Sequence, residues 1–171
     1  NQLWTRLAYN ANQQNTDITN QAGLDYHYDY CTCGALTGIV DPKLQPTTWT
    51  RDAQSRPTAK TYANSLGSTL AYQTNQSLVA STTDANNHTT IISYNLDNTV
   101  SNITYAAETP SVSLFYDTNY IRLTSWIDGQ GTNFIGYIPA GQPAAGSIAA
   151  ITNAYPATIQ YQYDVLGRNN Q

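Results

Sequence analysis

The chain has 171 residues, 11 acidic and 7 basic side chains, and a formal net charge of −4 at pH 7. This balance argues against nucleic acid as a partner, because no excess of Lys and Arg is present to neutralise phosphates. It also argues against disorder, since charged residues make up only 11% of the chain and 14 Tyr and 3 Trp are present. No run of 18 apolar residues occurs, so no membrane span is expected.

The composition is typical of an all-β protein. Thr, Ser, Asn, Gln, Ala and Tyr dominate; Thr and Tyr favour strands, whereas Asn favours turns. Lys occurs only at positions 43 and 60 and Glu only at 108, although a helical protein of this size would use many more. We therefore expect a single all-β domain over residues 1–171, with a sparsely charged surface of extracellular type.

The chain repeats from end to end with a period near 22 residues. Each repeat is marked by a doublet that closes a strand, in most copies Tyr followed by a polar residue. The doublets are Tyr9-Asn10, Tyr28-Asp29, Arg51-Asp52, Tyr72-Gln73, Tyr94-Asn95, Tyr116-Asp117, Tyr137-Ile138 and Tyr163-Asp164. Each unit reads as strand, turn, strand, turn, so we expect about eight tandem β-hairpins in an antiparallel strip.

Alternating hydrophobicity predicts individual strands, in chain order, within Tyr26–Tyr30, Thr90–Asp97, Ser111–Asp117 and Thr158–Val165. In each of them one face is aromatic and aliphatic, and the other is mostly polar. Tyrosines of neighbouring repeats are expected to stack as a ladder across the sheet. The ladder predicted from the doublets consists of Tyr28, Tyr72, Tyr94, Tyr116 and Tyr163.

Aspartates recur at fixed places in the repeat, which indicates a structural role in turns rather than a unique catalytic pair. Those predicted to accept backbone N–H groups after the doublet are Asp29, Asp52, Asp117 and Asp164, with Arg56, Arg122 and Arg168 in the same turns. A second turn opens with Asp41, Asp84 or Asp128. Residues 136–150, rich in Gly and Pro, break the period and predict a long loop at the rim.

These turns and doublets resemble the Rhs, or YD-repeat, family, whose signature is Tyr-Asp, two residues, Gly-Arg, Leu-Thr and then Asp-Pro. Tyr163–Arg168 matches best, Tyr28–Pro42 comes close and Arg51–Arg56 is a fair copy, whereas the copies at Tyr72 and Tyr137 are degenerate. The resemblance implies hairpins that coil into a spiral or hollow shell. In bacterial toxin complexes such a shell encloses a toxic C-terminal polypeptide, and in teneurins it is a cell-surface adhesion scaffold.

Sixteen strands would exceed the roughly ten beyond which open sheets curl, so curvature is expected. Neither chain end resembles the capping unit of a solenoid. Two explanations stay open: a slice of a longer shell protein, or chains that complete one another head to tail as a fibre. The self-cleavage segment of Rhs toxins is not carried over, because Asp41-Pro42-Lys43-Leu44 lacks its Gly.

The cysteines and histidines carry no recognisable catalytic or zinc pattern. Cys31 and Cys33 on one strand would lie about 6.5 to 7 Å apart, at the limit for a disulfide, so unpaired residues in a loop are favoured. A disulfide across a turn and metal pairing with His27 are the alternatives. His27 and His88 are expected to be exposed polar residues, and calcium at Asp128 finds no supporting motif. No cofactor and no metal are expected.

We therefore expect a non-enzymatic structural protein, extracellular or at the surface of a bacterial cell, with itself or the rest of a longer shell as partner. The alternative is an adhesion module in which exposed Trp49 and Trp126 stack on sugars or on a protein surface. Asn75, Asn87 and Asn102 match the N-glycosylation pattern, which chance readily produces in a chain so rich in Asn, Ser and Thr.

Overall fold

The computed structural model describes residues 3–106 and 108–170, and every regular element in them is a β-strand. The fifteen strands are β1 (Thr5–Tyr9), β2 (Asn15–Asn20), β3 (Asp25–Tyr30), β4 (Leu36–Val40), β5 (Pro46–Arg51), β6 (Pro57–Tyr62), β7 (Gly67–Tyr72), β8 (Val79–Thr83), β9 (Thr89–Tyr94), β10 (Val100–Thr104), β11 (Val112–Tyr116), β12 (Leu123–Asp128), β13 (Gly131–Tyr137), β14 (Ile148–Thr152) and β15 (Thr158–Gln160).

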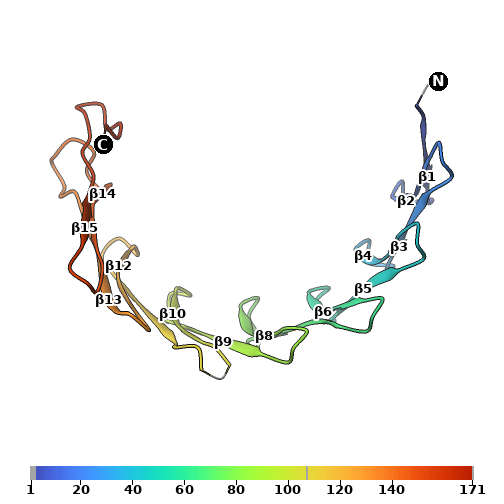
Figure 1. Ribbon diagram of the computed structural model, residues 1–171, viewed down its shortest axis with the longest axis horizontal. Helices are drawn as coiled ribbons and strands as arrows, with labels where there is room; N and C mark the ends of the chain where they lie inside the picture. The colour runs from blue at the N-terminus through green and yellow to red at the C-terminus, as the bar shows by residue number, and fades with distance from the viewer. Residues whose placement is uncertain (1–2, 107, 171) are drawn as a thin grey trace. The chain divides into compact units, whose positions relative to one another are not determined.

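The strands are hydrogen-bonded in chain order from β1 to β15, and the pairs with a defined register are antiparallel. The prediction of an all-β strip of tandem hairpins is therefore confirmed. Residues 1–89 and residues 90–171 form two compact units, where the sequence analysis expected one domain. Within each unit the hairpins follow one another along the sheet (Figure 1).

Each unit is a single layer. No hydrophobic side chain of the described residues is buried; the buried positions among them are Asn133, 6% exposed, and Gly38. The chain exposes 11753 Å², whereas a compact protein of 18.8 kDa exposes roughly 8,300 Å². The surplus reflects a sheet with no second layer against it.

The two faces of the sheet differ in solvent exposure. In β5, Thr47, Trp49 and Arg51 are half-buried, and Thr48 and Thr50 between them are exposed. The register places Tyr28, Ile39 and Thr47 in one row on the same side as Trp49. We call this side the tyrosine face and the other the threonine face.

A register shift marks the end of the odd-numbered strands. It falls just before Tyr9, Tyr30, Arg51, Tyr72, Tyr116 and Tyr137, and the extra residue lies on the following strand. In β9 and β10 the shift separates the Tyr94–Val100 pair from its neighbour. A β-bulge therefore accompanies each repeat and strengthens the local twist.

The bulges correct the predicted repeat. Tyr28 and Asp29 lie inside β3, and the residue that ends this strand is Tyr30. With Tyr30 in place of Tyr28, the first three intervals are 21, 21 and 21 residues, rather than 19, 23 and 21. The prediction selected Tyr28 because its neighbour Asp29 completes the Tyr-Asp pair.

Many of the turns between strands have a residue with positive φ in the fourth place, counted from the residue that opens the turn. Gly167 occupies this place with φ 77°, as the family signature implies, and Ser55 occupies it with φ 64°. The turn that opens at Asp117 is one residue longer, and its fifth residue, Ile121, has φ 50°. The expected rim loop is shorter than predicted, since β13 ends at Tyr137 and β14 begins at Ile148. A sixteenth strand is replaced by one isolated bridge between Tyr163 and Asn169.

Candidate functional site

Side chains at the ends of β3, β5, β7 and β13, and Tyr163 after β15, donate hydrogen bonds to the hairpin before them. In the first unit, Tyr30 Oη donates to Asn15 O at 2.9 Å and Tyr72 Oη donates to Pro57 O at 2.8 Å. In the second unit, Tyr137 Oη donates to Leu123 O at 2.7 Å and Tyr163 Oη to Ile148 O at 3.0 Å. These donors, with Arg51, form the set that we call the ladder.

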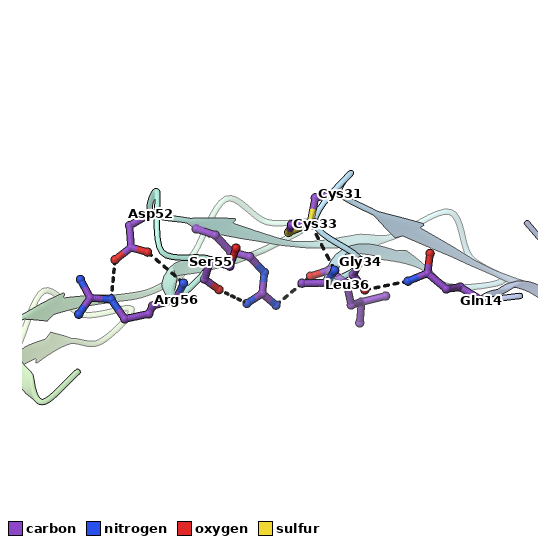
Figure 2. Close-up of a disulfide and its surroundings, with 10 residues drawn as sticks. Gln14, Cys31, Cys33, Gly34, Leu36, Asp52, Ser55 and Arg56 are labelled. Carbon is purple, nitrogen blue, oxygen red and sulfur yellow. Dashed lines mark hydrogen bonds and ion pairs between the residues drawn. A yellow bond between two sulfur atoms is a disulfide. The ribbon is translucent and has the colours of Figure 1, made fainter. Parts of the chain in front are cut away.

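Arg51 occupies the same place in β5 as the ladder tyrosines and makes the same contact. Its Nη2 donates to Leu36 O at 3.0 Å, and its Nη1 donates to Ser55 O at 2.9 Å (Figure 2). A guanidinium and a phenol therefore serve interchangeably as donors. The position requires a long side chain with a terminal donor rather than an aromatic ring.

The bulges explain why these carbonyls can accept a side-chain donor. Every acceptor is the first residue of an even-numbered strand, and its cross-strand partner is the terminal residue of the strand before it. The extra residue that follows interrupts the backbone ladder at this point. A backbone oxygen released in this way must find another donor, and the next hairpin supplies it.

Arginines of the turns stack on the ladder tyrosine of the next hairpin. The Arg56 guanidinium lies 4.2 Å from the centre of the Tyr72 ring, and that of Arg122 lies 4.1 Å from the centre of the Tyr137 ring. Arg56 also donates to the backbone carbonyl of Gln76 in the next turn. Arg56 and Arg122 therefore each link two successive repeats. The sequence predicts these arginines as turn residues but does not predict this link.

Aspartates hold these arginines and shape the turns. Asp52 Oδ1 accepts the N–H groups of Gln54 and Arg56, while its Oδ2 lies 2.7 Å from Arg56 Nε. Asp164 makes the equivalent bonds with Leu166 and Arg168. Asp117 Oδ1 accepts from Asn119 and Tyr120, and its Oδ2 lies 3.5 Å from Arg122 Nη2. Backbone N–H donors lower the pKa of Asp117 and of Asp164.

Arg168 differs from its counterparts in exposure. Its side chain is 74% exposed, against 22% for Arg56 and 27% for Arg122, although it keeps its ion pair with Asp164 at 2.7 Å. Arg56 and Arg122 are covered by a tyrosine of the following hairpin. Among the described residues, no aromatic ring lies over the Arg168 guanidinium.

Asp29 serves a different purpose from the predicted one. It lies on the threonine face of β3, where its Oδ1 is 3.3 Å from His27 Nε2; His27 Nδ1 is 2.7 Å from Asp17 Oδ1. The hydrogen bond with Asp17 raises the pKa of His27, and that bond lowers the pKa of Asp17. His27 is 47% exposed and Asp29 58%, so the cluster is open to water. A cleft that could exclude water from a reaction is not formed by these three residues.

Cys31 and Cys33 form a disulfide with a Cα–Cα distance of 5.1 Å. The preferred prediction of unpaired cysteines is therefore wrong. Its premise was a strand, in which residues i and i+2 lie farther apart; Cys31 instead follows β3 and opens a turn that brings Cys33 back toward it.

The second set of turns also uses aspartate caps. Asp41 Oδ1 accepts from the N–H of Lys43 and Gln45, and Asp84 Oδ1 from Asn86 and His88. His88 lies 3.5 Å from Asp84, in an exposed turn.

The groups around Asp128 are N–H hydrogen-bond donors, which do not bind a cation. Its oxygens accept from Gln130 N, Trp126 Nε1 and Asn133 Nδ2. These donors would have to leave before calcium could bind.

The tryptophans expected to be exposed are half-buried. Trp49 lies under Lys60, whose Nζ is 5.5 Å from the ring centre, and Trp126 donates its indole N–H to Asp128. Trp49 is on the tyrosine face. The prediction of exposed stacking platforms is wrong for these two residues, since both side chains are half-buried.

The three predicted glycosylation sites lie in different surroundings. Asn75 and Asn87 are exposed in turns, each with positive φ. Asn102 lies in β10 and donates to Ser113 Oγ at 3.0 Å. A glycan on Asn102 would break this bond, so Asn75 and Asn87 are the better acceptors.

No cluster of three or more His, Cys, Asp or Glu side chains among the described residues has the arrangement to hold a metal ion. The same residues contain no helix with the length and apolarity needed to cross a bilayer.

Comparisons with solved structures match almost the whole chain. The Tc holotoxin pore of Photorhabdus luminescens aligns over 96% of the chain with a TM-score of 0.60 and 15% identity. The crystal structures of TcdB2-TccC3-Cdc42 and of TcdB2-TccC3 without its hypervariable C-terminal region each align over 98% with a TM-score of 0.56 and 14% identity. The likeness shows the fold. It supports the Rhs-like architecture that the sequence resemblance implies.

The chain spans 8% of the matched chain of the pore and 11% of the two others. No family model and no curated protein matches the sequence.

Proposed function

We propose that this chain is a non-enzymatic structural segment of an extracellular β-shell, in which other parts of the same assembly cover its tyrosine face. The observation that carries the proposal is the exposed surface of 11753 Å² together with the absence of any buried hydrophobic side chain among the described residues. A single-layer sheet gains little burial to set against the conformational entropy of folding. Neighbours that cover the tyrosine face would add to its stability.

The contacts that the sheet does make run along its length. The ladder and the arginine stacks join consecutive hairpins. So does the turn-to-turn bond from Gln14 Nε2 to Gly34 O, at 2.7 Å (Figure 2). Such nearest-neighbour contacts suit a strip that extends by repetition. They would build a continuous wall of hairpins. The Tc toxin structures with the same fold are consistent with such a wall.

A second candidate is a head-to-tail fibre, favoured by one observation. Arg168 is 74% exposed, and Tyr9, at the other end of the repeat series, is 58% exposed. Tyr9 of a second copy would stack on Arg168 as Tyr72 stacks on Arg56. The contact is heterologous, so copies would add head to tail and form a filament when the rotation between them does not close into a ring.

Electron microscopy of the native, unheated material separates the two candidates. Closed hollow particles support the shell. Long uniform filaments overturn it in favour of the fibre, and these should be lost in Arg168→Ala but kept in Arg6→Ala, which removes an arginine outside the stacks. Both candidates require the tyrosine face to be exposed to solvent in the isolated chain. A monomeric protein that binds no hydrophobic dye would therefore contradict both.

A further inference from the structure

The disulfide between Cys31 and Cys33 closes a turn that other repeats close without one. Asn10, Asp52 and Asp164 open equivalent turns, and in each an Oδ1 atom accepts the N–H groups of the second and fourth residues that follow. In the cysteine turn, Ala35 N donates to Cys31 Sγ at 3.3 Å, and Cys33 occupies the second place. The bridge therefore replaces a polar cap.

The backbone of this turn is hydrogen-bonded in the same way as in turns that have no bridge. The backbone bonds of the turn, Cys31 N to Ala35 O and Gly34 N to Cys31 O, are both 2.9 Å, as in the turns without cysteine. Gln14 and Gly34 fasten the same turn to the hairpin before it (Figure 2). A disulfide across a single intervening residue also removes little entropy from the unfolded chain, because that effect grows with loop length. Stability alone does not account for the pair.

The two sulfurs differ in access and in surroundings. Cys33 is exposed, whereas Cys31 is half-buried and already accepts a backbone N–H. Positions equivalent to Cys31 hold the carboxylates of Asp52 and Asp164 and the amide of Asn10. Backbone N–H donors lower the pKa of Asp164 there. The donors of this turn can therefore stabilise an anion at the place of Cys31 Sγ.

We propose that the Cys31–Cys33 disulfide is a thiol-exchange site, at which an external thiol bonds to Cys33 and Cys31 leaves as a thiolate held by the Ala35 N–H. A thiolate attacks Sγ of Cys33; one S–S bond forms, the Cys31–Cys33 bond breaks, and its electron pair goes to Cys31. A second thiolate can attack the external sulfur of this mixed disulfide. Two thiols are then oxidised to one disulfide, and both cysteines are reduced. A stabilised leaving thiolate accelerates such exchange.

Thiol exchange would give the Cys31–Cys33 turn a reversible covalent attachment point in addition to its structural role in the sheet. The partner is a thiol, either a small molecule or a cysteine of another polypeptide. The structure favours Cys33 over Cys31 as the attachment atom in both cases.

The test uses the full chain with reduced glutathione as the small thiol and, separately, a peptide with one cysteine as the polypeptide thiol. Acid quenching followed by peptide mapping should find the adduct on Cys33. A reaction with glutathione alone would assign the site to small thiols, and a reaction with both would extend it to polypeptides. An adduct mainly on Cys31, or no adduct with either probe, overturns the proposal.

Two matched variants test the anion site directly. In Cys33→Ser the remaining Cys31 thiol should be alkylated by iodoacetamide about tenfold faster at pH 6.5 than the Cys33 thiol of Cys31→Ser, because donors to a thiolate lower its pKa. Equal rates would refute the role of the Ala35 N–H. The double variant Cys31→Asp/Cys33→Ser restores the common aspartate turn, and its unchanged circular dichroism and thermal midpoint would show that the turn folds without the bridge.

Discussion

Replacing Tyr72 with Phe removes one hydroxyl from the ladder and keeps the ring over Arg56. The lost bond, from Tyr72 Oη to Pro57 O, is 2.8 Å long and open to water on one side. A neutral hydrogen bond contributes about 1 kcal/mol net, and water can partly replace this one, so Tyr72→Phe should lower the free energy of unfolding by about 0.5–1 kcal/mol. Tyr72→Ala also removes the ring and should cost about 2–3 kcal/mol.

Equilibrium denaturation in urea measures both changes. Tyr62→Phe is the matched control, because Tyr62 carries the same hydroxyl on a ring that is 46% exposed and lies outside the ladder. A double-mutant cycle of Tyr72→Ala with Arg56→Ala isolates the stack, 4.2 Å from guanidinium to ring centre, for which a coupling of about 0.5–1 kcal/mol is expected. If Tyr72→Phe is no more harmful than Tyr62→Phe, the hydroxyl does not join the hairpins. A coupling near zero would likewise refute the stack.

Three further changes address backbone strain, charge and close packing. Ile121→Gly should stabilise by about 1 kcal/mol in urea denaturation, because φ at this exposed β-branched residue is 50°. The pKa of His27 is raised by its bond to Asp17; the resulting stability is fully present below the unfolded pKa near 6.5 and is lost as pH rises through the folded value. Thermal midpoints across pH 5–8 should show this loss, weakly for so exposed a pair, and His27→Gln should abolish it. Gly67→Ala should destabilise by more than about 2 kcal/mol in urea denaturation, since a Cβ there would lie 2.0 Å from Lys60 O.

Each of these changes has a control elsewhere in the chain. Thr118→Gly, in the same turn as Ile121 but without positive φ, should destabilise rather than stabilise. His88→Gln should leave the pH dependence in place, because the nearest carboxylate oxygen to His88 is 3.5 Å away. Gly136→Ala should be tolerated, since its Cβ would meet nothing closer than 3.9 Å. The opposite result in a control would show that positive φ at Ile121, the bond from His27 to Asp17, or the Cβ clash at Gly67 does not cause the corresponding effect.

The hairpin strip could be predicted because its causes are local. Alternation with a period of two sets each strand, and a repeat near 22 residues sets the hairpins, so neither needs knowledge of distant contacts. The aspartate caps are local as well, as at Asp52, Asp117 and Asp164. For the same reason the sequence placed the turns close to where the structure has them.

The ladder could be predicted only in part, because a bulge decides which tyrosine ends a strand. Tyr26, Tyr28 and Tyr30 alternate along β3, and nothing in the alternation distinguishes them. The more even spacing of 21 residues through Tyr30 was the available signal, and the Tyr-Asp match at Tyr28 outweighed it. The carbonyl acceptors could not be foreseen, since they arise from backbone geometry rather than from residue type.

Arg51 shows which property this position of the repeat retains when the residue type changes. It resembles tyrosine neither in charge nor in shape, yet it reaches Leu36 O at 3.0 Å, as the ladder tyrosines reach the equivalent oxygens at 2.7–3.0 Å. The constraint on this position is therefore the satisfaction of a carbonyl that the bulge has released. A sequence search for Tyr at this place misses such copies. A search for any long donor at 21- to 22-residue spacing would find them, because the requirement comes from the neighbouring hairpin's backbone.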